Sequence, residues 1–309
     1  MTATDATTRT ELQDPGWLSS RAAHICAMGL WLLSLALFRQ PLSSLVSLSF
    51  RDERSSHILL IPLISACLVY LRRKRVFCAP RYCPSIGILL FLIAAVLWYG
   101  LRTPLSSFDP TDRLSVVAFL IVLVWIGVFV LCYGTRAFQA ASFTLLFLLM
   151  MIPLPAAVVE RTVSVLQKGT AETCHALFRL IGVPFVRHGF RFSLPGVDIE
   201  IAEQCSGIHS GLSLFIVGLL AGHVFLQSTW KKTCLILCTL PIAIFKNAVR
   251  IVTISWLGIH VNSEFFHGAL HRQGGLPFSL LALALMALLL WLLRRPLLLR
   301  RPPDGNLAG

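Results

Sequence analysis

The chain has 309 residues, of which 56% are hydrophobic and only 13% are charged, and its mean hydropathy is +0.77. A water-soluble domain of this length needs more charged surface, whereas repeated apolar runs of about 18 or more residues are typical of bilayer-spanning helices. The formal net charge of +13 does not indicate nucleic acid, because the Lys and Arg residues lie mainly at the ends of apolar runs, where they set membrane topology.

The nine cysteines give no disulfide framework, since their number is odd and no spacing repeats. Most lie inside apolar runs, where a free thiol behaves as a small hydrophobic group. Cys78 and Cys83 lie in a basic loop without the second pair that a zinc site needs, so we expect no metal and no other cofactor. Residues 1–21 are polar and partly acidic, which is not the pattern of a signal peptide, and we expect them to form a cytoplasmic tail.

Eight apolar runs predict an all-α membrane bundle of about eight transmembrane helices. The expected spans, in chain order, are residues 22–38 (or 22–48), 57–71, 86–101, 114–133, 137–152, 205–226, 233–256 and 277–293. We expect one membrane domain over residues 22–294, followed by a basic cytoplasmic tail at 295–309, because no internal repeat or long linker divides the chain.

The basic residues between the apolar runs predict the orientation. They are Arg72, Arg73, Lys74, Arg75, Arg81, Arg136, Lys231, Lys232, Arg294, Arg295, Arg300 and Arg301. If eight helices alternate, all of these residues fall on one side of the membrane. The positive-inside rule makes that side cytoplasmic and places both termini there, with the opposite side facing outward.

The longest loop on the other side, about residues 153–203, has two kinds of pattern. Apolar residues first repeat at helical spacing, in the sets Val159, Val163, Leu166 and Cys174, Leu177, Ile181. This spacing predicts an amphipathic helix lying on the outer surface of the membrane. Apolar and polar residues then alternate on both sides of Pro195-Gly196, which predicts a short β-hairpin that leads directly to Cys205.

Cys205 is the strongest candidate nucleophile. It lies at the outer start of the sixth predicted helix, where unpaired backbone N–H groups and the helix dipole favour a thiolate. The neighbouring Ser206 and His209 are costly beside lipid unless they face a protein interior or a wet cavity, so we expect them to bind substrate together with Asn247. Small residues at Gly207 and Gly211 predict the close approach of another helix, and Gly218 and Gly222 repeat this spacing deeper in the membrane.

Two further groups complete a candidate catalytic set. Arg250 lies within the seventh predicted helix, where a charge costs about 2.5 kcal/mol or more, and its fixed donors suit a thiolate, a carbonyl oxygen or an oxyanion. The loop before the last helix contains His267 and His271, and either can act as the general base. Because the last three predicted helices alternate in direction, Cys205, Arg250 and these histidines share one outer membrane depth.

The same stretches of sequence resemble the exosortase/archaeosortase family. The resemblance covers about residues 20–293 and is densest from residue 153 to residue 250. The matching motifs are Ser56-His57, Ile61-Pro62, Ile152-Pro153-Leu154-Pro155, Leu166-Gln167, Gly182-Val183-Pro184, the predicted hairpin, Cys205-Ser206-Gly207-Ile208, Pro241 through Asn247, and Arg250-Ile251.

The resemblance implies a membrane-embedded cysteine protease and transpeptidase. Such proteins are expected to recognise a C-terminal sorting signal, made of a Pro-Glu-Pro-like motif, a hydrophobic helix and a basic cluster, and to pass the cleaved protein to a surface acceptor. Bacterial members often accompany exopolysaccharide production. By position, Cys205 corresponds to the nucleophile, Arg250 to the family arginine and His271 to the third residue, because Gly275 and Phe278 follow it at suitable spacing. His267 is the alternative base.

A non-enzymatic role in polysaccharide export or assembly is the competing hypothesis. It explains the helices but not the clustering of Cys205, Arg250 and His271, and a transporter should carry its polar groups near the bilayer midplane. The sequence has no Gly-x-Ser-x-Gly elbow and no His-Glu-x-x-His motif, which argues against serine and zinc proteases. Hydrolysis and transpeptidation share one thioester intermediate, so both remain open, and so does the oligomeric state.

Overall fold

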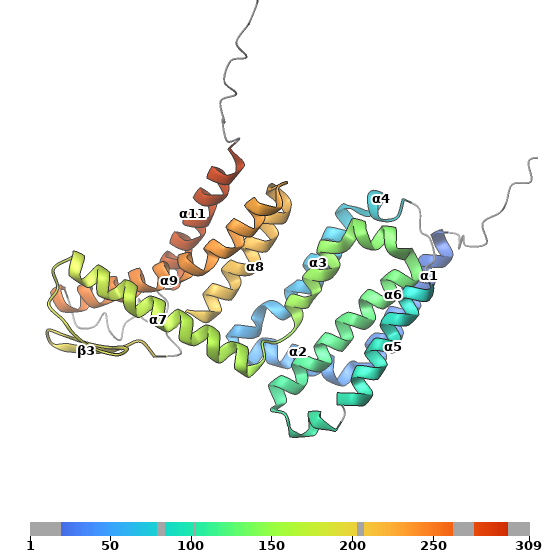
Figure 1. Ribbon diagram of the computed structural model, residues 1–309, viewed down its shortest axis with the longest axis horizontal. Helices are drawn as coiled ribbons and strands as arrows, with labels where there is room; N and C mark the ends of the chain where they lie inside the picture. Colours follow the sequence, from blue (N-terminus) through green and yellow to red (C-terminus); the bar gives the residue numbers. More distant parts are fainter. Residues whose placement is uncertain (1–19, 79–83, 102, 203–206, 262–274, 296–309) are drawn as a thin grey trace, which may run out of the picture. The chain divides into compact units, whose positions relative to one another are not determined.

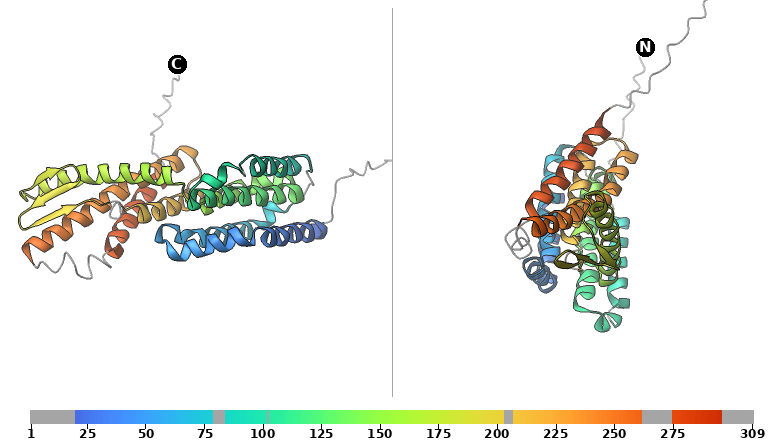
Figure 2. Two further views of the ribbon diagram at one scale, coloured as in Figure 1. Left: turned by 90° about the horizontal axis from the view of Figure 1, so that it is seen from below. Right: turned by 90° about the vertical axis from the view of Figure 1, so that its left-hand side faces the viewer.

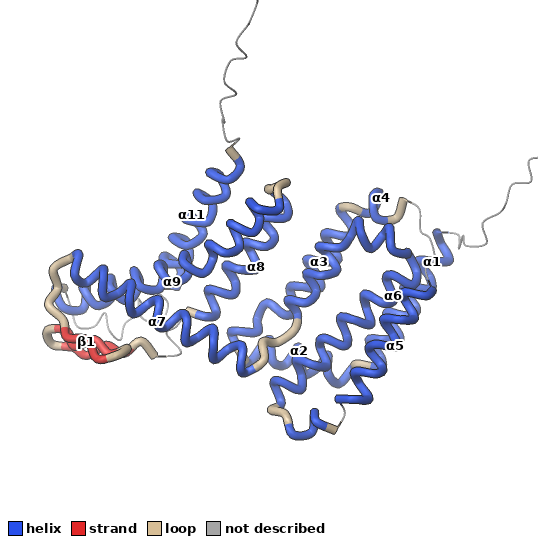
Figure 3. Tube along the Cα trace, viewed as in Figure 1, coloured by secondary structure: helices blue, strands red, loops and turns tan. Residues whose placement is uncertain are grey.

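The computed structural model describes residues 20–78, 84–101, 103–202, 207–261 and 275–295. The chain forms two compact units, Met1–Pro155 and Ala156–Gly309. Helices make up most of the described chain, and a small three-stranded sheet lies in the second unit (Figure 3). The predicted helical class is therefore confirmed, with one strand more than the predicted hairpin has.

The first unit is helical over its described residues. Its elements are α1 (Ser20–Leu37), α2 (Arg39–Arg51), the 3-10 helix η1 (Glu53–Leu59), α3 (Leu60–Leu71), α4 (Arg73–Val76), α5 (Pro84–Leu101), η2 (Pro104–Ser107), α6 (Pro110–Phe147) and η3 (Leu148–Met151) (Figure 1). The axes of α1 and α2 differ in direction by 74°, so the first apolar run is bent rather than straight.

Helix α6 supplies much of the core of this unit, and α1 and α5 pack against it. Its backbone leaves helical geometry at Gly134, where φ is 82° and ψ is 177°, so the helix is kinked there. Only glycine adopts such angles readily. The sequence predicts a break between residues 133 and 137, and the structure confirms it.

Several helices are long and apolar enough to cross a membrane. Within the described ranges there are six, or seven if the bent pair α1 and α2 is one span. The six are Arg54–Leu71, Pro84–Leu101, Pro110–Met151, Ile208–Phe225, Thr229–His260 and Leu276–Arg294. A multi-pass membrane protein is thus confirmed, whereas the count of about eight spans stays a prediction.

The second unit is built around one long helix. Its elements are α7 (Ala156–Leu180), β1 (Val186–His188), β2 (Arg191–Leu194), β3 (Val197–Glu200), α8 (Ile208–Phe225), α9 (Thr229–His260) and α11 (Gly275–Arg294) (Figures 1 and 2). Helices α7, α8 and α11 all pack against α9. The candidate site described below is built from α9 and from helices that contact α9.

The predicted hairpin is present as strands β2 and β3. They pair antiparallel with Leu194 opposite Val197, and Gly196 takes φ of 83° in the two-residue turn between them. Strand β1 adds a third strand beside β2, which the sequence analysis did not predict. The order β1-β2-β3 is that of a simple meander.

The predicted helix in the long loop is also present, as α7. Its buried residues Cys174 and Phe178 form a core with Phe192 of β2 and with Ala248 and Val252 of α9. Protein therefore covers much of its apolar face, so this part of the face is not available to lipid. The position of α7 at the outer membrane surface stays a prediction.

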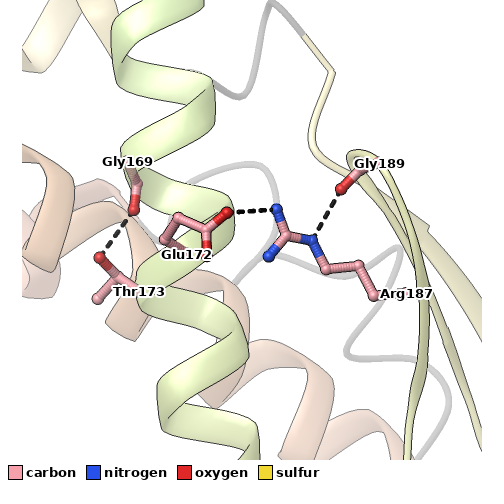
Figure 4. A network of polar contacts seen from close by, with 5 residues as sticks. All are labelled: Gly169, Glu172, Thr173, Arg187 and Gly189. Carbon is pink, nitrogen blue, oxygen red and sulfur yellow. Dashed lines mark hydrogen bonds and ion pairs between the residues drawn. The ribbon is translucent and has the colours of Figure 1, made fainter.

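An ion pair connects strand β1 to α7. Arg187 Nη2 lies 2.8 Å from Glu172 Oε1, and Arg187 Nε donates to the carbonyl oxygen of Gly189 at 2.9 Å (Figure 4). On the same stretch of α7, Thr173 Oγ1 donates to the carbonyl oxygen of Gly169 at 2.8 Å. The hydrogen bond and the charge of Arg187 lower the pKa of the Glu172 carboxyl.

Candidate active site

The glycines of α8 face α9 and let the two helices approach closely. A Cβ added at Gly218 would lie 2.9 Å from Thr239 Cγ2, and one added at Gly211 would lie 3.6 Å from Ala243 Cβ. The first distance is too short for any larger residue without a shift of the neighbour. The predicted small-residue contact along this helix is therefore confirmed, with α9 as the partner helix.

Gly207 immediately precedes α8 and takes a conformation that favours glycine. Its φ is 77° and its ψ is 16°, the left-handed region, which costs other residues roughly 1–2 kcal/mol. A Cβ at this position would also lie 3.2 Å from Asn247 Cγ of α9. The residue just before α8 therefore lies directly against a side chain that the sequence analysis assigned to the substrate site.

Buried amides hold the chain on both sides of residues 203–206. On one side, Gln167 Nε2 of α7 donates to the carbonyl oxygen of Ile201 at 2.9 Å. On the other side, Asn247 packs against Gly207, and Asn247 Nδ2 donates to Thr170 Oγ1 of α7 at 3.4 Å. Asn247 is 1% exposed and Thr170 is fully buried. Polar residues of α7 and α9 therefore contact both flanks of residues 203–206, through a hydrogen bond at Ile201 and close packing at Gly207.

The described site residues lie on two helices. Arg250 is half-buried on α9, one turn after Asn247, so both lie on the same part of this helix. His209 is exposed in the first turn of α8. The predicted site residues Cys205, Ser206, His267 and His271 lie outside the described residues. Their arrangement with Arg250 stays a prediction.

Lys246 is a buried cation beside the candidate site that the sequence analysis did not name. It precedes Asn247 on α9, is 4% exposed, and its Nζ donates to Ser210 Oγ of α8 at 2.5 Å. The signal was in the sequence, because a lysine within an apolar run is functional by default for the same reason as Arg250. Two cationic residues one helical turn apart therefore mark this part of α9.

The buried cysteine of α7 is not suited to nucleophilic chemistry. Cys174 is fully buried, and burial raises the pKa of its thiol to about 12. Its Sγ lies 3.9 Å from the carbonyl oxygen of Ala248, so it packs as a small core residue. Within the described ranges, no group of three or more His, Cys, Asp or Glu side chains is arranged to hold a metal ion.

These features define a class of protein: a multi-pass helical membrane protein with a small sheet that leads into a helix packed through glycines against a cationic partner helix. The sequence model of the transmembrane exosortase family (Exosortase_EpsH) matches residues 46–291, which is well over half of the chain. The chain therefore belongs to the transmembrane exosortase family. No curated protein and no solved structure gave a significant match to this chain.

Proposed function

We propose that this protein is a cysteine peptidase of the transpeptidase type, which cleaves a C-terminal sorting signal of exported, membrane-anchored proteins. Membership of the exosortase family supports a membrane transpeptidase. The single structural observation that carries the assignment to this chain is the fixation of both flanks of residues 203–206 by Gln167 and Asn247. Such fixation of the backbone suits a nucleophile that must meet its substrate in one geometry.

In the proposed reaction, the thiolate of Cys205 attacks the carbonyl carbon of the scissile peptide bond. A thioester forms, the peptide C–N bond breaks, and the leaving amine takes the proton that the histidine base removed from the thiol. Arg250 stabilises the oxyanion of the tetrahedral intermediate. An acceptor nucleophile or water then attacks the thioester and releases Cys205. His271 is the proposed base, and His267 is the alternative.

The proposed substrate site adjoins these residues. Asn247, Ser206 and His209 bind the substrate backbone near a Pro-Glu-Pro-like motif, while the hydrophobic helix of the sorting signal lies in the lipid bilayer. The protein acts in the bacterial inner membrane, with its active site facing the periplasm and a role in exopolysaccharide-associated sorting. The polarity of Asn247 beside the start of α8, together with the apolar spans, supports this division between motif and membrane helix.

Substitution of the nucleophile tests the proposal. We expect Cys205→Ala and Cys205→Ser to abolish processing of a co-expressed substrate that carries a sorting signal, while the protein still inserts and accumulates. Cys234→Ala and Cys238→Ala are matched controls on α9 and should leave processing unchanged. The readout is the mass of the new C-terminus of the substrate. Full processing by Cys205→Ala would remove the thiol mechanism.

A further inference from the structure

The end of α8, the start of α9 and the end of α11 meet at one place in the second unit. Arg294 Cζ, at the end of α11, lies 5.3 Å from the centre of the Phe225 ring, which ends α8. Lys231 Nζ, in the first turn of α9, donates to the carbonyl oxygen of Leu293 at 2.6 Å. Since α8 also packs along α9, each of the three helix ends lies beside the other two.

Four cationic side chains gather where these helix ends meet, and we call this group the basic junction. Its members are Lys231, Lys232, Arg294 and Arg295. A Cβ added at Gly222 of α8 would lie 3.8 Å from Lys232 Cβ, so this lysine starts on the side of α9 that faces α8. Both lysines are half-buried, whereas both arginines are exposed. The four charges therefore come from two helices and surround the end of a third.

The helices that form the basic junction contain no carboxylate to balance it. Residues 207–261 and 275–295 include no Asp and no Glu. The acidic residues that the structure describes in the second unit lie on α7 and β3, where two of them pair with arginines of the sheet. Helix α7 packs against residues 244–252, in the other half of α9. Within the described part of the second unit, the basic junction thus has no acidic partner, and its charge complements an anion.

Exposed aromatic rings lie beside these cations. Arg295 Cζ lies 3.5 Å from the centre of the Trp291 ring, and Lys231 Nζ lies 5.8 Å from that of Trp230. A guanidinium that stacks on a ring uses its face, and its N–H donors remain directed outward in its plane. All three helices are candidate membrane spans, and aromatic rings at the ends of such spans are typical of the level of lipid headgroups.

An apolar stripe leads from the basic junction along α11. Leu288 and Leu292 are exposed on the described structure, and they share a helical face with Arg295 because they precede it by seven and three residues. A soluble phosphate would use only the cations, whereas a phospholipid would use both the cations and the stripe. The combination therefore favours a lipid as the anionic ligand.

We propose that the basic junction binds the phosphate of an anionic phospholipid, with Lys232, Arg294 and Arg295 as its ligands and with an acyl chain along the stripe of α11. Lys231 is a positioning residue, because its hydrogen bond to the Leu293 carbonyl holds the start of α9 against the end of α11. The inference concerns a lipid site and is independent of the proposed peptidase activity.

Titration of the full-length protein in detergent with single lipids tests the inference, and native mass spectrometry measures the fraction that carries lipid. We expect the wild type to bind phosphatidylglycerol more tightly than phosphatidylcholine with the same acyl chains. Arg294→Gln/Arg295→Gln should weaken binding of phosphatidylglycerol by about thirtyfold and leave that of phosphatidylcholine unchanged. The control is Lys168→Gln/Arg179→Gln, which removes two exposed charges from α7 and should keep the wild-type affinity.

Two further measurements cover the case in which the neutral variant fails to accumulate. Arg294→Lys/Arg295→Lys keeps both charges and should retain most of the affinity for phosphatidylglycerol, and salt should weaken this binding in the wild type. Equal affinity of the wild type for the two lipids would overturn the inference, as would binding that salt does not change or an equal loss in the α7 control. Displacement of phosphatidylglycerol by an equal concentration of glycerol 3-phosphate would show a site for soluble phosphate instead.

Discussion

At the scale of single residues, Gln167 and Asn247 contact the two residues, Ile201 and Gly207, that lie on either side of residues 203–206. Both are amides with 9% or less of their surface exposed, and they come from two different helices. Truncation of Gln167 would leave the buried carbonyl of Ile201 without its donor, at a cost of about 1–3 kcal/mol. Because both flanks of residues 203–206 depend on such contacts, we expect catalytic geometry to be sensitive to residues that do not touch the substrate.

The choice between the two histidines is a prediction at the same scale. We expect His271→Ala to reduce processing by about 10²–10⁴-fold, the usual contribution of a general base, and His267→Ala to do far less. Alkylation of Cys205 against pH provides the second measurement, because loss of an imidazolium partner should move the reactive range upward. A shift in His267→Ala alone would show that His267 is the base.

The polar residues of the site were only partly predictable from the sequence. Asn247 and Arg250 stand out because polar groups are rare within apolar runs, and the structure places both on α9. Lys246 carries the same signal but lies next to Asn247, and only the packing of α8 shows that its ammonium reaches Ser210. Contacts between helices distant in sequence depend on packing, which residue periodicity alone does not specify.

At the scale of elements, we predict from the break at Gly134 that α6 crosses the membrane twice. The stretch Pro110–Met151 has 42 residues, about 63 Å of helix, which is twice the thickness of a hydrocarbon core of about 30 Å. We expect cysteines introduced at Thr111 and Met150 to react with an impermeant maleimide from one side, and a cysteine at Arg136 from the other. Reaction of Thr111 and Met150 positions from opposite sides would contradict the prediction and indicate a single crossing.

The ion pair between Glu172 and Arg187 predicts a pH-dependent contact between α7 and the sheet. The hydrogen bond and charge of Arg187 hold the pKa of Glu172 below its usual value in the folded state, so the stabilisation is present at neutral pH and is lost as pH falls through the lowered pKa. We expect Glu172→Gln to lower Tm at pH 7 but to match the wild type near pH 2, and the difference should shrink with salt. The control is Glu200→Gln, which removes a carboxylate that lies 3.5 Å from Arg191 in the wild type. An equal Tm difference at both pH values would contradict this account.

Periodicity predicted some elements well and missed others for physical reasons. The hairpin at Pro195-Gly196 follows from strict alternation around a turn dipeptide, and the break at Gly134 follows from a glycine between two apolar runs. The bend between α1 and α2 lies at Phe38, where the shorter of the two predicted first spans ends, and Pro41 follows in the first turn of α2. Strand β1 has three residues, too few for alternation to be recognised, and it depends on pairing with β2.

At the scale of the whole molecule, the distribution of basic residues predicts the orientation in the membrane. We expect a cysteine at Lys168 to be labelled from the periplasmic side and a cysteine at Arg300 to be labelled only after the cytoplasmic side is opened. Lys168 is exposed on α7, so its side chain is accessible to reagent. Labelling of both positions from the same side would contradict the eight-helix topology and the shared depth of Cys205, Arg250 and His271.

The central claim is that Cys205 forms a thioester with the substrate. The most direct measurement is mass spectrometry of the peptide that contains Cys205, after the full-length protein is incubated with a substrate that carries a sorting signal. The account predicts an added mass equal to the cleaved substrate fragment, released by hydroxylamine and absent when Arg250→Ala or His271→Ala prevents acylation. Substrate cleavage without any adduct on Cys205, undiminished in Cys205→Ala, would contradict the account.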